Sequence, residues 1–351
     1  VAEAAEQGKT GGIYEPIKPY TKPISVDGAL CKQTDGTTVW RTDDESKRQS
    51  ARDHCYQTTE LTAERTNRGT RLSPVDRASG LLDDQFQTPA LERLRAIALQ
   101  RKEPIAADEL VQDWTGDTLR AAVAGCSDTA PGPSGLCYWM IATTTDEMRD
   151  LLAEAMNLYQ AARYMPDGMR HSYVYPIPKS CIGGATFQGA RQICFLETLL
   201  KLITGEITQK AMAIWEERQY LHPAQNGFRK HHNAGDLASF VVAVEAMYRA
   251  KGKPLFTVSA DITKAFQSLG ICGVEASLLR LGIPEDVMEL WMQSDRGEWF
   301  QGQRADGLWE ASYGTCQVIT GSAGLSPSFE TETGLRQGSR CAPTKYSAWM
   351  D

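Results

Sequence analysis

The feature that most constrains the fold is an apolar stretch that runs directly into a carboxylate. Residues 255–260 have the side chains of a buried strand, and they lead into Asp261 and the turn sequence DITKAF. A carboxylate at the end of a buried strand is costly unless a positive charge neutralises it, and a metal ion is the usual reason for such a placement. The ordinary alternative is an aspartate that caps a following helix. This stretch alone leaves both interpretations open.

The composition is typical of a soluble globular chain, and its charge is uneven. Of the 351 residues, 42% are hydrophobic and 23% charged, which suffices for two or three subdomains with real cores. The net charge is −7, yet residues 171–270 carry 11 Lys/Arg and 7 Asp/Glu, a balance of 11 − 7 = +4. A basic middle predicts one anion-binding face. No apolar run approaches the ~20 residues of a membrane helix, so we expect no membrane partner.

Cysteine usage indicates the compartment weakly. The nine cysteines include no CxxC pair and are irregularly spaced, which fits neither a zinc site nor a disulfide framework. Reduced, buried thiols are the better interpretation. We therefore expect an intracellular protein.

Three regions are predicted, and together they indicate an α+β fold. Residues 1–90 are polar, with Pro16, Pro19 and Pro23 close together, and are expected to form an extended N-terminal extension. Residues 91–250 mix amphipathic helices with short strands, and residues 251–351 continue the alternation.

Several elements are predicted individually within these regions. Helices are expected over residues 108–125, 143–164 and 237–250. The second should begin with a capping box of Thr144 and Glu147 and bury an apolar face that includes Met148 and Leu151. Strands are expected in residues 172–180 and 190–196, and β-hairpins in residues 299–332.

Five short motifs follow one another in an order that carries more information than any one of them. They are APGPSG, YPIPKS with ARQI, PAQNGFRK, SADITKAF and GLRQGSRCAP. In this order they resemble the reverse transcriptase domain of non-LTR (LINE-type) retrotransposons, over residues 91–351. The resemblance implies the fingers and a partial palm of a right-hand polymerase, with an antiparallel palm sheet and packed helices and without a thumb.

The resemblance also implies catalytic and nucleotide-binding roles. Asp261 is similar to the first metal-binding carboxylate of the family, with the carbonyl of Ile262 as a further ligand for Mg²⁺ in a two-metal mechanism. Phe266 resembles the residue that packs under the nucleotide sugar, although an ordinary core phenylalanine is an equal alternative. Lys179 and Arg191 resemble the residues that hold the incoming deoxynucleoside triphosphate.

Two further segments would contact nucleic acid. Gln337 and Gly338 resemble a loop that touches the template base and the nucleotide, where a side chain on the glycine would block close approach. Arg229 and Lys230 would grip phosphates of an RNA template or DNA primer. The remaining nucleic-acid-binding candidates come from the same motif and are Gln225, Gly227 and Phe228.

The chain also departs from the family pattern. Ser134, Gln192, Gln267 and Ala342 stand where the family usually has Asp, Pro, Asp and Ser. The paired aspartates of the second catalytic motif should follow GLRQG, and none occurs before Asp351. We therefore expect an N-terminal fragment of an RNA-directed DNA polymerase, inactive alone. The location expected for such a protein is nuclear.

The alternative is a domesticated, non-catalytic scaffold or RNA-binding component of a ribonucleoprotein, with structural RNA as its partner. For this alternative an organellar location is also open.

Overall fold

A computed structural model of the chain describes residues 29–32, 38–41, 43–59, 101–127, 129–178, 190–262, 264–295, 299–303, 309–311, 314–320, 323–331 and 334–351. The described chain mixes helices with strands and contains one four-stranded mixed sheet, so the α+β class is confirmed. Its elements are β1 (Ala29–Lys32), β2 (Thr38–Arg41), α2 (Asp44–Thr59), α6 (Ala107–Leu110), α7 (Gly116–Ala124), α8 (Tyr138–Thr143), α9 (Asp146–Ala162), α10 (Asp167–Arg170), β3 (Ser172–Pro178), β4 (Ala190–Phe195), α11 (Thr198–Glu217), α12 (Ala234–Ala250), α13 (Ile271–Arg280), α14 (Glu285–Met292), β5 (Trp299–Gln303), β6 (Trp309–Ala311), β7 (Gly314–Val318), β8 (Phe329–Thr331) and α15 (Ala342–Met350).

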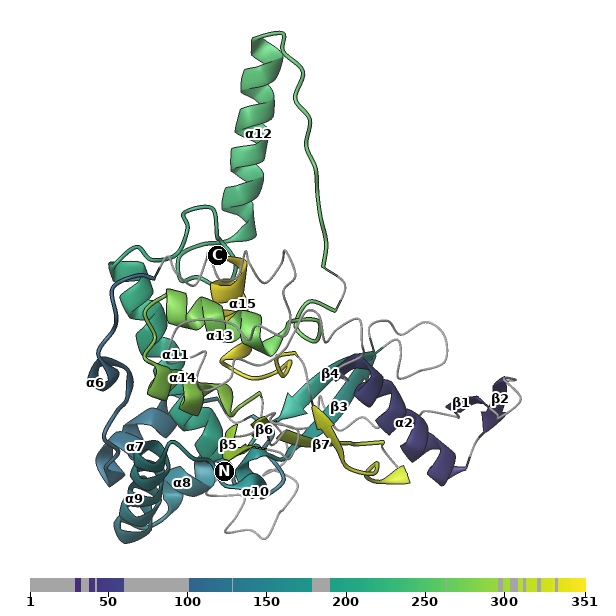
Figure 1. The fold of residues 1–351 in the computed structure, drawn as a ribbon, viewed down its shortest axis with the longest axis vertical. Helices are drawn as coiled ribbons and strands as arrows, with labels where there is room; N and C mark the ends of the chain where they lie inside the picture. Colours follow the sequence, from purple (N-terminus) through teal and green to yellow (C-terminus); the bar gives the residue numbers. More distant parts are fainter. Residues whose placement is uncertain are drawn as a thin grey trace.

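A helical lobe surrounds α11 and contains most of the core (Figure 1). Trp215 of α11 and Trp291 of α14 are both fully buried, with ring centroids 6.3 Å apart. The indole N–H of Trp215 donates to the carbonyl of Leu281 at 3.0 Å, so its polar atom is satisfied inside the core. The core of this lobe packs α11, α13, α14 and α15 together, and it thereby positions the loops that follow these helices.

The four-stranded sheet has the order β4-β3-β7-β8. β3 pairs with β4 antiparallel and with β7 parallel, and β7 pairs with β8 antiparallel. The strands predicted in residues 172–180 and 190–196 are therefore present. The hairpins predicted in residues 299–332 are present as β5–β6 and β7–β8. The sheet expected to be antiparallel is mixed, because β3 and β7 run side by side in the same direction.

The described part of residues 1–90 differs from the predicted extended N-terminal extension. Residues Asp44–Thr59 form α2, which packs on the sheet through Ala51 and Cys55. Arg48 adds a hydrogen bond of 3.0 Å from its guanidinium to the carbonyl of Ala323. The buried side chains of α2 are few and small, so the sequence shows no apolar stripe to reveal a helix.

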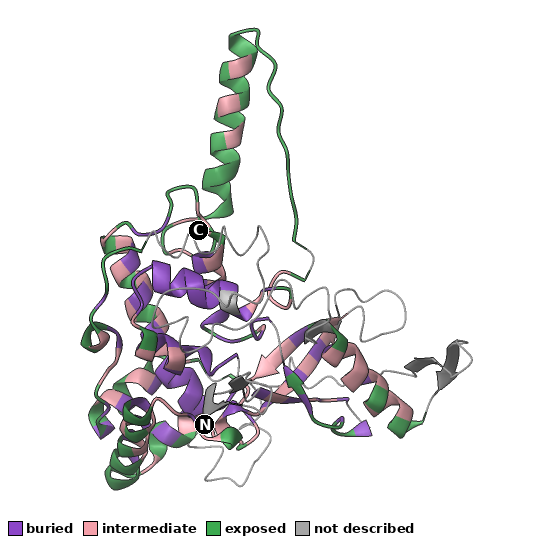
Figure 2. Ribbon diagram, viewed as in Figure 1, coloured by how far each residue is buried: buried purple, intermediate pink, exposed green. Residues whose placement is uncertain are grey.

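The strand predicted at residues 255–260 is absent. Residues 253–262 have no regular secondary structure, and the side chains of Phe256 and Val258 are 89% and 91% exposed. The helix before them, α12, projects from the molecule and buries none of its residues (Figure 2). We call residues 234–262 the arm. Because the arm leaves the body, none of the described strands pairs with residues 253–262.

The face of α9 that is buried also differs from the prediction. The helix begins after Thr145, whose hydroxyl accepts a hydrogen bond from the N–H of Met148, so the cap lies one residue beyond Thr144. Met148 and Leu151 are 48% and 59% exposed. Met156, which also belongs to the predicted apolar face, is fully buried. The buried residues share the i, i+4, i+7, i+11 spacing of an adjacent stripe and are Arg149, Ala153, Met156 and Gln160. Polar members conceal this stripe in the sequence.

Within the ranges that the structure describes, no helix combines the length and the apolar character required to cross a membrane.

Candidate functional site

The turn that follows Asp261 lies against the GLRQG segment. The N–H of Leu335 donates to the carbonyl of Phe266 at 2.8 Å, and the N–H of Gly334 donates to the carbonyl of Leu269 at 2.9 Å. Gly334 has a φ of +83°, and a Cβ there would lie 2.7 Å from the Cα of Gln267. Only glycine fits such a contact without a shift of the backbone. Two motifs separated by some 70 residues are thus held together through their main chains.

The same segment also contacts β4. The N–H of Cys194 donates to the carbonyl of Gln337 at 2.7 Å, and the side-chain amide of Gln267 lies 3.4 Å from that of Gln337. Gly338 has a φ of +100°, and a Cβ there would approach Ile193 to 2.8 Å. Arg191, three residues before Cys194, is exposed. The structure therefore brings Arg191, Gln337 and Gly338 to one part of the molecule.

An aromatic cluster joins the PAQNGFRK loop to the DITKAF turn. Phe266 packs against Tyr346 of α15 at 5.2 Å between ring centroids and against Phe228 at 6.2 Å. Phe228 adopts a φ of +60° and remains 57% exposed, and the carbonyl of Gly227 accepts a hydrogen bond from Ser347. Phe266 is therefore half-buried beside an exposed aromatic face, a position compatible with both of its predicted interpretations.

Asp261 lies at the edge of this cluster. Burial raises the pKa of Tyr346, and the negative charge of Asp261 raises it further, so the carboxylate lies near the phenol. Asp261 and Ile262 are both exposed. In the part of the chain that the structure describes, no three His, Cys, Asp or Glu residues gather where they could hold a metal ion.

The predicted phosphate-gripping residues differ in their surroundings. Arg229 forms two hydrogen bonds of 2.7 Å with the carboxylate of Glu216, and these hold the pKa of Glu216 below its usual range. Its guanidinium also donates to the carbonyls of His222 and Gln225. Arg229 thus shapes the loop, whereas the neighbouring Lys230 is exposed.

The APGPSG loop is tied to the end of β4. The N–H of Ser134 donates to the carboxylate of Glu197 at 2.7 Å, and its hydroxyl donates to the same carboxylate. A Cβ on Gly132 would lie 2.6 Å from the backbone nitrogen of Glu197. Ser134 therefore has a defined partner despite its departure from the family pattern. Lys179 lies outside the described residues.

A buried ion pair beneath the GLRQG segment was not predicted from the sequence. Lys345 and Asp295 are both fully buried, 2.6 Å apart. Lys345 also donates to the carbonyl of Trp291 and the hydroxyl of Ser294, and the second carboxylate oxygen of Asp295 accepts from the N–H of Arg336 at 2.8 Å. These residues lie some 50 positions apart in segments without a shared motif, so no sequence signal pairs them.

No known protein family matches this chain as a whole or in part. A search of curated proteins also finds no match.

Proposed function

We propose that this chain is the fingers and part of the palm of an RNA-directed DNA polymerase of the LINE type. The observation that supports it is a continuous series of contacts between motifs that are distant in sequence. APGPSG contacts Glu197, the N-cap of α11 two residues after β4. β4 contacts GLRQG, GLRQG contacts the turn of DITKAF, and Phe266 of that turn contacts PAQNGFRK. A polymerase site needs such a convergence, because template, nucleotide and metal meet at one point.

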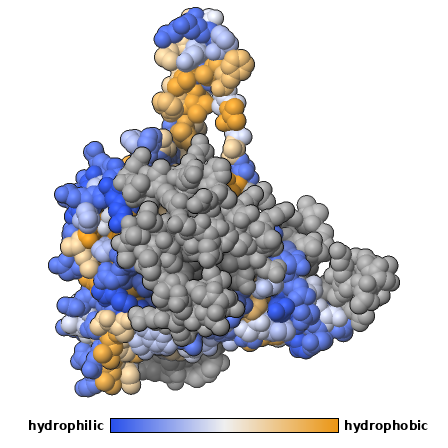
Figure 3. All heavy atoms as spheres, viewed as in Figure 1, coloured by the Kyte–Doolittle hydropathy of each residue, from blue (hydrophilic) through white to orange (hydrophobic). Residues whose placement is uncertain are grey.

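The arm gives the proposal a second support. Residues 253–262 place apolar side chains beside Asp261, and α12 presents Leu237, Phe240 and Met247 to solvent (Figure 3). Apolar surface of this extent normally has a covering partner. A palm strand that has yet to pair with its neighbours would have these properties, and the pairing would bury the surface around Asp261.

In this proposal the residues of the chain have separate tasks. Arg191 would bind phosphate oxygens of the deoxynucleoside triphosphate, and Gln337 with Gly338 would face the template base. Phe266 would limit the space beneath the sugar. Asp261 would provide one carboxylate for Mg²⁺, which would activate the primer hydroxyl when bound. The other carboxylates have to come from outside the described residues.

The test is primer extension on an RNA template by a longer form of the protein that contains the paired aspartates expected beyond Asp351. Asp261→Ala should reduce extension below detection, because a metal ligand is lost. Glu245→Ala, an exposed carboxylate on α12, is the matched control and should extend normally. Because Asp261 is exposed, the melting temperature should be the same in both variants. Normal extension by Asp261→Ala would overturn the proposal, and extension by residues 1–351 alone would show that the metal site is complete without further carboxylates.

A non-catalytic scaffold in a ribonucleoprotein is the second candidate. The observation that favours it is the full engagement of Arg229 by Glu216, which leaves this motif cation to stabilise a loop. The two candidates differ in one outcome. A scaffold would bind structural RNA in a salt-sensitive manner, while the longer form would show no extension with or without Asp261.

A further inference from the structure

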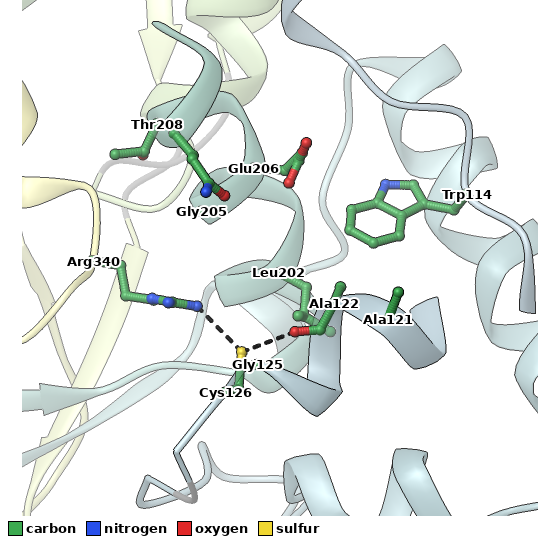
Figure 4. A pocket seen from close by; sticks show the side chains of 11 residues that line it. Trp114, Ala121, Ala122, Gly125, Cys126, Leu202, Gly205, Glu206, Thr208 and Arg340 are labelled. Carbon is green, nitrogen blue, oxygen red and sulfur yellow. Dashed lines mark hydrogen bonds between the residues drawn. The ribbon is translucent and has the colours of Figure 1, made fainter. Parts of the chain in front are cut away.

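A cleft lies along the N-terminal half of α11. Two adjoining cavities of ≈ 460 Å³ and ≈ 440 Å³ share Gly125, Cys126 and Arg340 in their walls. Figure 4 shows the side chain of Arg340 reaching across toward Cys126, with Trp114 on the far wall. The second cavity continues past Arg340 to Lys201 of α11, Tyr138 of α8 and the end of β4. Arg340 thus stands at the middle of one cleft.

Two cations lie along the same face of α11 in this cleft. Lys201 and Gly205 are four residues apart and therefore neighbours on the helix surface. A Cβ on Gly205 would lie 3.9 Å from the guanidinium of Arg340, so Arg340 crosses the helix one turn from Lys201. A Cβ at position 205 would therefore be in ordinary van der Waals contact with the arginine.

Neither cation forms an ion pair with a described carboxylate. The ammonium of Lys201 donates to the carbonyl of Ala130 at 3.1 Å and to the hydroxyl of Thr129 at 3.4 Å, and it lies 5.3 Å from the ring centre of Tyr138. Arg340 donates a hydrogen bond to the sulfur of Cys126 at 3.5 Å and also interacts with the hydroxyl of Tyr138. A thiol is a weak acceptor for a guanidinium with five donors.

The charges around Lys201 are mixed, with Arg340 and the Glu197 carboxylate both nearby, and Glu206 in the wall of the adjoining cavity pairs with Lys210. Burial lowers the pKa of Lys201 to about 8; the Glu197 carboxylate opposes the shift, and Arg340 adds to it. Glu197 is itself engaged by Ser134. Two cations close enough to disfavour each other's charge gain stability when an anion is placed between them.

We propose that this cleft is a phosphate-binding site in which Arg340 and Lys201 hold the phosphate group. The arginine provides a planar pair of donors for two phosphate oxygens, and the lysine contributes its remaining proton and its charge. The hydroxyls of Thr129 and Tyr138 lie on the same wall. The phosphate belongs either to a small molecule or to an RNA backbone, and both present the same chemistry to these side chains.

The test is calorimetric titration of the whole chain with pyrophosphate, which requires no polymerase activity and is therefore independent of the function proposed above. Arg340→Gln and Lys201→Gln should each weaken binding about ten- to hundredfold, as the loss of a charge-assisted hydrogen bond implies. The matched control is Lys210→Gln on the same helix, whose ammonium pairs with Glu206 and whose loss should leave the affinity unchanged. Failure of pyrophosphate to bind the wild-type chain, or equal affinity in all four proteins, would overturn the proposal.

A second measurement does not depend on the folding of any variant. Lys201 of the wild-type chain should be acetylated more slowly by an amine-reactive reagent when pyrophosphate is present, with Lys210 as the internal reference in the same mass spectrum. Unchanged labelling of Lys201 would contradict the site. Competition then separates the two sources of the phosphate. If a short single-stranded RNA displaces pyrophosphate and binds Arg340→Gln more weakly than the wild-type chain, the RNA backbone is the ligand. If the RNA does not displace pyrophosphate, the ligand is a small phosphorylated molecule.

Discussion

At the scale of single residues, the buried pair of Lys345 and Asp295 stands out because every polar atom of the two charged groups has a partner. The lysine ammonium has three acceptors, and the aspartate accepts from both the lysine and the N–H of Arg336. Burying such a pair costs desolvation energy, and its contacts recover that cost only when every charged atom has a partner. Its structural effect is to join the end of α14 and α15 to the segment that carries Gln337 and Gly338.

Removal of one partner should therefore be far more damaging than removal of both. Asp295→Ala should lower the free energy of unfolding by about 3–5 kcal/mol, because an unpaired buried ammonium remains. The double variant Asp295→Leu with Lys345→Met should recover most of that loss. Urea denaturation measures both. A double variant as unstable as the single one would show that packing, and not charge, dominates at this position.

The lowered pKa of Lys201 predicts a pH dependence with a definite sign. Below about pH 8 both the folded and the unfolded chain hold the proton, and the folded state bears the cost of the buried charge. Between about pH 8 and the unfolded pKa of 10.5, the folded state releases the proton first, so the free energy of unfolding should rise with pH.

The measurement is the urea midpoint of the wild-type chain minus that of Lys201→Met at pH 7 and at pH 9.5. The wild-type midpoint minus the variant midpoint should be larger at the higher pH. Thiols and phenols titrate equally in both proteins, so their contributions cancel in this difference. A difference that is constant or falls with pH would contradict the lowered pKa.

At the scale of elements, the existence of most helices and strands could be predicted, but their surroundings could not. β3, β4, α12 and the hairpins follow from local patterns of apolar and turn residues. The buried stripe of α9 was predicted only at Met156, because two of its four members, Arg149 and Gln160, are polar and donate to carbonyls outside the helix. α2 was missed because Ala51 and Cys55 are too small to mark a face. Residues 255–260 have the composition of a strand, yet pairing depends on a neighbour that composition does not specify.

The candidate site, like the fold, could be predicted only in part. The sequence predicted a shared site from the order of the motifs, and the structure places the turn of Phe266 beside the segment of Gln337 and Gly338. It also shows that Arg229 pairs with Glu216, which lies thirteen positions earlier at the C-terminal end of α11, beside the loop. No spacing rule predicts that pairing.

The fit of the GLRQG segment against β4 gives a prediction for the glycine at its end. Gly338→Ala should destabilise the chain by about 1–3 kcal/mol, since the φ of +100° strains a residue with a side chain and the added Cβ would push against Ile193. Thermal unfolding of this variant can be compared with Gly168→Ala, where nothing lies within 4 Å of the new Cβ. Equal melting temperatures would mean that the segment moves away from β4 without cost.

At the scale of the whole molecule, the division into a dense body and an exposed arm is the main feature. The helical lobe buries large side chains completely, while α12 and residues 253–262 bury none (Figure 2). An extended apolar segment with an open edge is a site of association.

Polar substitutions on the arm should change association and leave stability unchanged. Phe256→Ser together with Val258→Ser should lower the apparent mass in concentrated solution and reduce the fluorescence of a dye that binds apolar surface. The melting temperature should stay the same, because neither side chain contributes to the core. Light scattering and calorimetry measure the two quantities, and a marked fall in melting temperature would show that the arm packs against the body.

The attachment of α2 to the sheet has a consequence for the way the chain is made. The contact between Arg48 and Ala323 spans 275 residues, and at about 5–20 residues per second a ribosome needs roughly 14–55 s to synthesise that interval. The helices from α6 to α14, built from closer neighbours, can form during this time, whereas β3 waits for β7 and α2 waits for both. Synthesis therefore sets the order of assembly: the helices from α6 to α14 can pack before α2 has a surface on which to dock, and Arg340 and α15 join them last.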